Sequence, residues 1–335
     1  MDFTELIDLA SERLGGRALA ANDEFFAPKE NLLKPAAPIF AADKYTDRGK
    51  WMDGWETRRR RTPGCDWCVI ALGLPGRIRG LVIDTSFFKG NFPALASLEA
   101  CAAGSAPSVE SLLDTGQSWT PLLPESALIG DSQNRFHITA PERFTHLRFK
   151  IFPDGGVARL RVHGDVLPDW KAIESAGEDI DLAAVERGGL VVASSDKFFG
   201  APANLILPGA SLGMFDGWET RRRRGPGHDF AVVRLGAPGI VHRVVVETSF
   251  FKGNFPESCS LDACRAASDA RDDTTHATFK WAEILPRSPL EADAHRVFEK
   301  ELRPSGEVTH VRLNIFPDGG VARLRVLGQR AKHAR

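Results

Sequence analysis

The sequence is 335 residues long, enough for two ordinary domains, and 43% of its residues are hydrophobic, as in a folded protein with a buried core. Its 43 basic and 44 acidic side chains nearly cancel, so we expect no extended cationic surface and no nucleic-acid partner. Five cysteines are an odd number for a secreted disulfide framework, which indicates free thiols in a reducing compartment.

The N-terminal stretch MDFTELIDLASERLGG does not resemble a secretory signal. Acidic side chains stand where such a signal needs a basic start and an uninterrupted apolar stretch. No window of the chain approaches the roughly 20 apolar residues that span a bilayer, so we expect no membrane partner. These observations predict a cytoplasmic protein.

Three blocks of sequence occur twice, in the same order. DGWETRRRR spans 53–61 and 216–224, TSFFKGNFP spans 85–93 and 248–256, and FPDGGVARLRV spans 152–162 and 316–326. The offset between the copies is almost constant. A constant offset of this length indicates a duplicated domain and not a short-period solenoid.

The same comparison sets the domain boundaries. Upstream of the three blocks, DEFFAPKENL at 23–32 matches DKFFGAPANL at 196–205 with a larger offset, so the first repeat carries extra residues around 39–50. We predict a first domain over residues 17–165 and a second over 190–330. The polar, helix-compatible segment 166–189 between them is predicted to be a linker.

Short β-rich runs bounded by Gly, Pro or Asp follow one another along both repeats. They span 66–73, 80–87, 145–152 and 157–162 in the first repeat, and 229–236, 244–251, 309–316 and 321–326 in the second. The PDGG segment between the last two runs predicts the turn of a β-hairpin. No strand–helix–strand alternation occurs. The sequence therefore predicts an all-β protein of two tandem antiparallel sandwiches, most consistent with jelly rolls.

The arginine runs lie at a loop-to-strand junction, because Gly and Pro follow them. In an extended segment alternate residues face opposite ways, so Arg58 and Arg60 are expected on one side and Arg59 and Arg61 on the other. Two interpretations stay open here. The arginines either pair with carboxylates such as Glu56 and otherwise face solvent, or bind a carboxylate or phosphate ligand as bidentate forks.

Two further positions carry chemistry that packing does not explain. Lys89 and Asn91, like Lys252 and Asn254 in the second repeat, supply the donors and the acceptor that a small polar ligand needs. The repeats also differ, since only the second has a histidine, His228, after its Gly-Pro-Gly. An imidazole there is either a candidate acid or base or a surface side chain.

The cysteine spacing does not predict a metal site. The pair at 65–68 has no counterpart in the second repeat and the pair at 259–264 has a wider gap, so buried free thiols are favoured over zinc. Glu219, His228 and Asp229 could bind a divalent ion, but their spacing matches no established ligand pattern. No cofactor is required by the sequence.

The duplicated blocks, which read DGWETRRRR, ETSFFKGNFP and HVRLNIFPDGGVARLRV in the second repeat, resemble the allantoicase family, the allantoate amidinohydrolases of purine breakdown, over nearly the whole chain. The resemblance implies two galactose-binding-like jelly rolls, a homo-oligomeric enzyme, and hydrolysis of allantoate to ureidoglycolate and urea. Allantoate carries a carboxylate and two ureido groups on one carbon. A site for it needs a cation, amide-matching donors and acceptors, and an acid and a base for the departing urea and the attacking water.

We assign proton transfer to Glu219 and His228, and prefer the second repeat because it holds the histidine. The groups that bind substrate or orient the catalytic groups are Asp216, Arg221, Arg223, Lys252, Asn254 and Asp318. A matching set in the first repeat, with Glu56 as its catalytic member, is Asp53, Glu56, Arg58, Lys89, Asn91 and Asp154. The sequence leaves open whether the site lies in one repeat, in both or between them. A non-catalytic ligand-binding jelly roll and an assembly scaffold are the competing classes.

Overall fold

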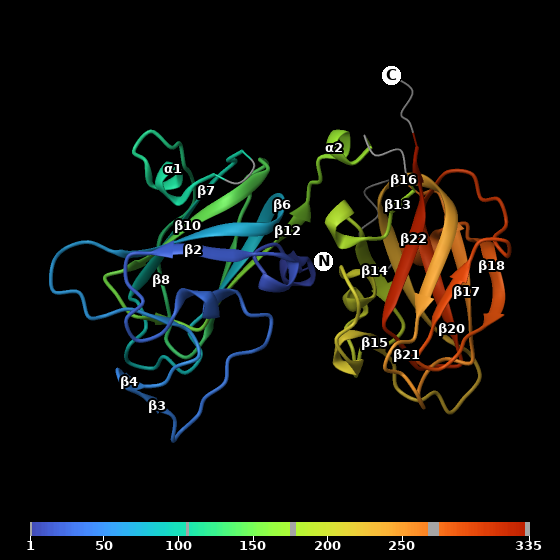
Figure 1. Cartoon of the computed structure of the whole chain (residues 1–335), viewed down its shortest axis with the longest axis horizontal. Helices are drawn as coiled ribbons and strands as arrows, with labels where there is room; N and C mark the ends of the chain where they lie inside the picture. Colours follow the sequence, from blue (N-terminus) through green and yellow to red (C-terminus); the bar gives the residue numbers. More distant parts are fainter. Residues whose placement is uncertain (1, 105–106, 175–178, 267–274, 332–335) are drawn as a thin grey trace. The chain divides into compact units, whose positions relative to one another are not determined.

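A computed structural model describes residues 2–104, 107–174, 179–266 and 275–331 of the chain, which divides into two compact units between Leu167 and Pro168 (Figure 1). The elements of the first unit are the 3-10 helices η1 (Phe3–Glu5), η2 (Glu12–Leu14) and η3 (Lys29–Leu33), the helix α1 (Val109–Leu113), and the strands β1 (Ile7–Asp8), β2 (Arg17–Ala21), β3 (Tyr45–Thr46), β4 (Gly49–Lys50), β5 (Trp55–Glu56), β6 (Asp66–Asp84), β7 (Leu95–Cys101), β8 (Thr120–Ala127), β9 (Gln133–His137), β10 (Phe144–Phe152), β11 (Gly156–Val157) and β12 (Arg159–Val166).

Over its described residues, the second unit repeats the order of the strands, without a counterpart of β3 and β4. Its elements are the helix α2 (Trp170–Glu174), the 3-10 helices η4 (Val185–Arg187), η5 (Pro202–Ile206), η6 (Met214–Asp216) and η7 (Thr275–Thr278), and the strands β13 (Ile180–Asp181), β14 (Leu190–Ser194), β15 (Trp218–Glu219), β16 (Asp229–Glu247), β17 (Ser258–Cys264), β18 (Ala282–Pro289), β19 (His295–Phe298), β20 (Val308–Phe316), β21 (Gly320–Val321) and β22 (Arg323–Arg330). No helix among the described residues is both long and apolar enough to cross a membrane.

Each unit begins earlier than the sequence predicts. In the first, β1 lies ahead of residue 17 and pairs with β12. In the second, β13 lies inside the predicted linker 166–189 and pairs with β22. These two-residue strands are too short to show a sequence period, but their backbone hydrogen bonds make them part of the folded units.

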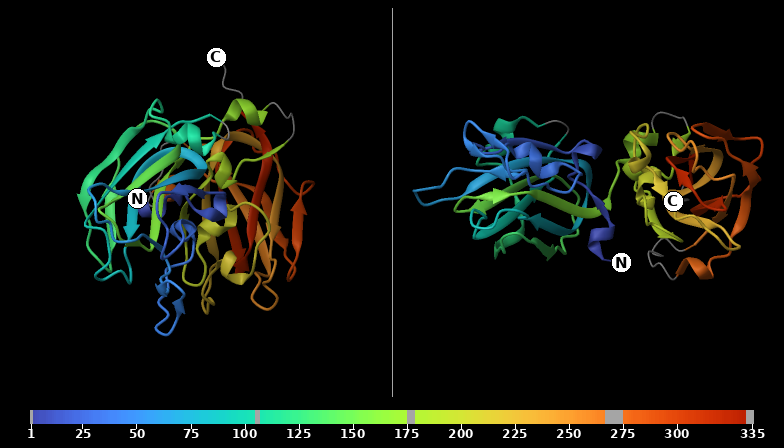
Figure 2. Two further views of the ribbon diagram at one scale, coloured as in Figure 1. Left: turned by 60° about the vertical axis from the view of Figure 1, so that its left-hand side comes forward. Right: turned by 90° about the horizontal axis from the view of Figure 1, so that it is seen from below.

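One long strand in each unit joins two layers of a sandwich. The first half of β6 pairs with β2 and β10, and the second half pairs with β9 and β12. The strand order is completed by β7 and β8 beyond β10 and by β1 beyond β12, and β16 plays the same part in the second unit (Figures 1 and 2). The antiparallel, all-β tandem architecture is thus confirmed. The runs at 66–73 and 80–87 are the two halves of β6, which bends near Pro75, where proline offers no N–H to the ladder.

The prediction that PDGG closes a β-hairpin is wrong. The flanking strands β10 and β12 lie on opposite sides of β6 and belong to different layers, so the segment carries the chain from one layer to the other. Gly155 has a φ of 137°, which favours glycine, and a Cβ on Gly156 would lie 1.9 Å from the Phe88 ring. The sequence shows that a turn needs glycine here, but it does not show which strands the turn connects.

Large apolar side chains fill both units. Trp55, Phe88 and Phe149 are fully buried in the first unit, and Trp218 and Phe251 occupy the same places in the second. All five cysteines are free, and four of them are buried, at positions 68, 101, 259 and 264. The prediction of buried free thiols thus holds at these four positions, whereas Cys65 is half-buried.

A buried ion pair fastens the DGWETRRRR segment to the sandwich in each unit. In the first, Arg159 Nη2 lies 2.7 Å from Asp53 Oδ2, and its Nη1 donates to the Asp53 carbonyl at 2.9 Å. In the second, Arg323 and Asp216 are fully buried and 2.8 Å apart. Burial raises the pKa of Asp53, but hydrogen bonds from Arg159 and the Ile39 backbone, with the charge of Arg159, outweigh this effect and hold that pKa below its usual value.

Substitution of Arg159 by methionine should destabilise the first unit by about 3 kcal/mol, because it leaves the buried Asp53 carboxylate with only the more distant Lys34 amine, at 3.6 Å, to balance its charge. Urea unfolding measured in that unit checks the value. Arg159 holds the native pKa of Asp53 down, and its loss leaves the effect of burial less opposed. The difference from wild type should therefore be largest where Asp53 is ionised in both proteins, and it should shrink as the pH falls and the carboxyl becomes protonated. Arg135→Met, which breaks an exposed pair with Asp2, is the control and should cost less than about 1 kcal/mol. Equal effects of the two substitutions would contradict the anchoring role.

Candidate active site

The DGWETRRRR segment of the first unit fixes a single carboxylate, that of Glu56. The indole of Trp55 is buried and donates to the Asp23 carbonyl at 2.8 Å. β5 pairs with β11, which sets Glu56 opposite Gly156, and the hydroxyl of Thr57 accepts from the Gly155 N–H at 3.1 Å. With its neighbours held on both sides, Glu56 has little freedom to move.

The arginines that follow mainly hold the loop in place. Arg58 Nε donates to Asp23 at 2.6 Å, and Arg60 lies 3.4 Å from Asp66. Asp23 and Asp66 lie close together, because Asn22, the neighbour of Asp23, donates a hydrogen bond to Asp66. Arg58 and Arg60 therefore reach the same side of the segment, as strand alternation predicts. Their partners are not the carboxylate of Glu56, which remains available to a ligand.

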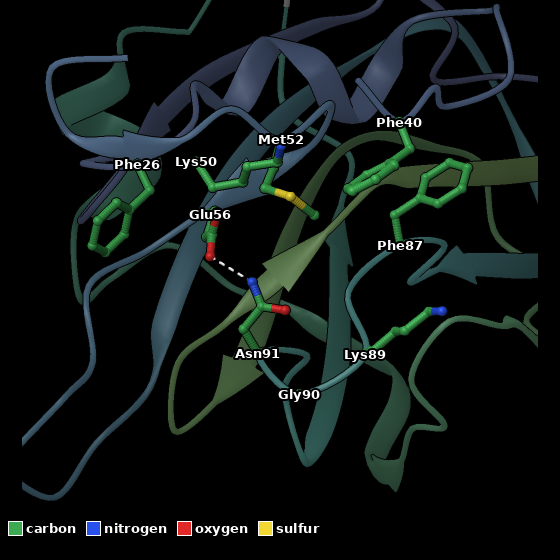
Figure 3. Close-up of a pocket in the computed structure, with 9 residues that line it drawn as sticks. All are labelled: Phe26, Phe40, Lys50, Met52, Glu56, Phe87, Lys89, Gly90 and Asn91. Atoms are coloured by element: carbon green, nitrogen blue, oxygen red, sulfur yellow. Dashed lines mark hydrogen bonds between the residues drawn. The ribbon is translucent and has the colours of Figure 1, made fainter. Parts of the chain in front are cut away.

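A cavity of about 490 Å³ opens beside Glu56 (Figure 3). Its lining combines one carboxylate, an amide, two amines and an apolar wall: Phe26, Phe40, Lys50, Met52, Glu56, Phe87, Lys89, Gly90 and Asn91. Asn91 Nδ2 donates to Glu56 Oε1 at 2.7 Å. Burial raises the pKa of Glu56, and the hydrogen bond from Asn91 opposes part of that rise. A carboxyl with a raised pKa in a cavity is a candidate acid or base.

The extra residues of the first repeat form the cover of this cavity. The segment 39–50 contains the hairpin of β3 and β4, which extends from the first unit at the bottom of Figure 1. The ring of Phe40 stacks on that of Phe87 at 5.7 Å (Figure 3), and Lys50 Nζ lies 5.2 Å from the centre of the Phe40 ring. The sequence revealed the insertion by its changed offset, but no local pattern assigned Phe40, Lys50 or Met52 to a site.

The loop that carries Lys89 and Asn91 is strained at its start. Phe87 has a φ of 69°, an uncommon conformation for a bulky side chain, and its N–H donates to Asp131 at 2.7 Å. Asp131 also lies 3.7 Å from Lys89 Nζ. Figure 3 shows Lys89 directed away from Glu56, at the edge of the cavity, where its exposed amine can meet an anionic ligand.

The second unit keeps the polar centre of this arrangement without its cover. Asn254 Nδ2 donates to Glu219 Oε1 at 2.5 Å, and both residues line a cavity of about 640 Å³. The second repeat has no counterpart of 39–50. As a result Phe215, at the position of Met52, is 75% exposed, whereas Met52 is 8% exposed.

Several residues assigned from the sequence lie outside the cavity of the second unit. His228 is exposed, lies 3.3 Å from Asn314 Oδ1 and packs on the ring of Phe316. Asp216 is buried against Arg323, and Arg221 donates to Asp196 at 2.6 Å. Lys252 is exposed beside Asp293. The structure thus does not bring His228 to Glu219, because the Gly-Pro-Gly bend directs it toward β20.

Two other assigned aspartates lie at the PDGG turns. Asp318 Oδ2 accepts from the Arg223 N–H at 2.7 Å, and Asp154 Oδ2 accepts from the Arg60 N–H at 2.8 Å. The Arg223 guanidinium pairs with Asp229. In the described parts of the chain, no cluster of three or more His, Cys, Asp or Glu side chains is placed to hold a metal ion.

Comparison with known proteins decides the family. A protein-family sequence model described as "Allantoicase repeat" matches residues 7–167 and 180–331. The chain belongs to the allantoicase family. It is 49% identical to an allantoicase of Dictyostelium discoideum, over 96% of this chain and 87% of that protein, and 45% identical to a probable allantoicase of Pseudomonas fluorescens, over 98% of each chain.

Solved allantoicase structures share the fold. The crystal structure of the Saccharomyces cerevisiae allantoicase has a TM-score of 0.80 at 36% identity, over 96% of this chain and 93% of that chain. The allantoicase repeat begins at residue 7 and resumes at 180, so both matched ranges include the short strands β1 and β13 that the sequence prediction left out.

Replacement of Asn91 by leucine should raise the pKa of Glu56 further, because the hydrogen bond that favours its charged form is lost. Carboxyl ¹³C chemical shifts followed through a pH titration measure this pKa. Lys89→Met is the matched control, since Lys89 lines the same cavity but bonds to Asp131 and not to Glu56. A pKa that falls in Asn91→Leu, or that starts below the ordinary value of about 4.3 in the wild type, would contradict the burial of Glu56.

Proposed function

We propose that the chain hydrolyses allantoate to ureidoglycolate and urea, and that the reaction takes place in the covered cavity of the first unit. Family membership over nearly the whole chain supports the reaction. The observation that carries the location is the carboxyl of Glu56, which is held by Asn91 beneath the 39–50 segment and has a raised pKa.

Glu56 is the proton-transfer group of this proposal. A base whose pKa lies nearer to neutral pH accepts a proton more readily while it still ionises, so burial suits Glu56 to the task. The carboxylate takes a proton from water, and the water oxygen bonds to the central carbon as the C–N bond to urea breaks. The departing nitrogen receives the proton that Glu56 took, which returns Glu56 to its carboxylate form. The atoms balance, because allantoate and water are consumed and ureidoglycolate and urea are formed.

The other lining residues bind the substrate. The amide of Asn91, one of whose N–H groups orients Glu56, offers its oxygen to a ureido N–H. Lys50 and Lys89 supply positive charge for the substrate carboxylate. Phe40, Phe87 and Met52 form an apolar wall that limits the access of water, which strengthens these electrostatic interactions.

The remaining parts of the proposal come from the sequence. We propose that the enzyme works in the cytoplasm and as a homo-oligomer, and that it uses its own side chains without a cofactor. The roles suggested by the sequence for Arg58, Asp53 and Asp154 become structural here, since Asp23, Arg159 and the Arg60 backbone engage them.

Separate Glu56→Gln and Glu219→Gln substitutions test the location. Loss of a general base costs on the order of 10²-fold to 10⁴-fold, and we expect a loss of this size in kcat for Glu56→Gln. The loss for Glu219→Gln should be at least tenfold smaller. Release of urea from allantoate measures both rates, and circular dichroism confirms that both variants fold.

Two results would overturn this assignment. Equal losses in the two variants would place the chemistry in both units, and a larger loss in Glu219→Gln would move it to the second. A wild-type chain that releases no urea over a range of pH and divalent metal ions would leave ligand binding as the function.

A further inference from the structure

The second unit retains a ligand-binding arrangement that the proposed reaction does not use. Its cavity is larger than that of the first unit, at about 640 Å³ against about 490 Å³. Glu219 and Asn254 line it and are joined by a hydrogen bond of 2.5 Å, like Glu56 and Asn91. A carboxylate and an amide side by side offer acceptors to ureido N–H groups and a donor to a ureido oxygen.

This pair is anchored as firmly as that of the first unit. β15 pairs with β21, which sets Glu219 opposite Gly320, and the Gly319 N–H donates to the Thr220 hydroxyl at 3.1 Å. Asp318 accepts from the Arg223 backbone. A pair held this way loses little conformational freedom when a ligand binds.

A guanidinium in the same cavity is available to an anion. Arg222 lines the cavity, and no hydrogen bond or ion pair to it occurs among the residues that the structure describes. Its neighbours Arg221 and Arg223 are engaged with Asp196 and Asp229. Arg59, at the same place in the first repeat, is not among the residues that line the first cavity. The second cavity therefore presents a carboxylate-binding fork beside a ureido-binding pair, and the carboxylates of Glu257 and Asp318 also line it.

We propose that the cavity of the second unit is a separate binding site for small carboxylates that carry a ureido group, and that it holds them without turning them over. Arg222 binds the carboxylate, and Glu219 with Asn254 binds the ureido group. The lining of this cavity has no counterparts of Phe40, Lys50 and Met52, so a ligand makes fewer contacts there and its affinity is lower than in the first unit. The inference rests on the proposed function, because the first cavity is taken as the reactive one.

Equilibrium dialysis with radiolabelled N-carbamoylglycine tests this site. This probe has one carboxylate and one ureido group. It lacks the second ureido group of allantoate, the one that leaves as urea. We expect two molecules bound per wild-type chain, the second more weakly. Arg222→Gln should weaken the second binding event by about 10-fold to 100-fold, because a charge-assisted hydrogen bond is lost. Arg224→Gln, an exposed arginine in the same run that does not line the cavity, should keep both events unchanged.

Asn254→Leu provides a second variant, which should lose the same event as Arg222→Gln. One bound molecule per wild-type chain, unaffected by Arg222→Gln, would overturn the inference, and so would two molecules that persist in both variants. Either result leaves the proposed function standing, as long as the wild type releases urea from allantoate and Glu56→Gln does not. Failure of that assay, with two molecules still bound, would count against the proposed function alone.

Discussion

The buried pair between Asp53 and Arg159 is the interaction on which the site of the first unit depends. It joins a loop to a strand that lies more than 100 residues further along the chain, and it fixes the start of the segment that ends in Glu56. A guanidinium that is 1% exposed must be matched by a carboxylate and by carbonyl acceptors, or the fold bears the cost of an isolated charge. The same requirement recurs with Arg323 in the second unit, so both units hold their loops in the same way.

The two units share this frame and differ in what covers it. Duplication gave each unit a Glu–Asn pair at the same position in the fold. Only the first unit has the segment 39–50, whose Phe40 and Lys50 line the cavity beside the pair. The cover places Glu56 in an environment that raises its pKa. The second unit lacks this segment, and Arg222 lines its cavity instead. Under the proposed assignment, this one insertion distinguishes the reactive site of the first unit from the binding site of the second.

Much of the fold was predictable because it rests on repetition and on local preferences. The three duplicated blocks predicted two units and the short β-rich runs predicted their sandwich fold. Residue type selected Asn91 and Asn254 as candidates, and the family resemblance added Glu219, with Glu56 as its match in the first repeat. The partners Asp23 and Arg159 were not predictable, since no local pattern links residues so far apart in sequence. His228 was preferred because an imidazole is a common acid or base, but the sequence does not show in which direction that side chain points. The same limit explains the PDGG hairpin, where the turn residues were recognised but not the layer to which each flanking strand belongs.

The most direct test of the account is a crystal structure of the Glu56→Gln chain with allantoate bound. We expect allantoate in the first unit, beneath Phe40. One ureido group should lie against the substituted side chain at position 56 and Asn91, and the carboxylate of allantoate should point toward Lys50 or Lys89. Allantoate bound at Glu219 and Asn254, with the first cavity empty at saturating concentration, would contradict the central claim.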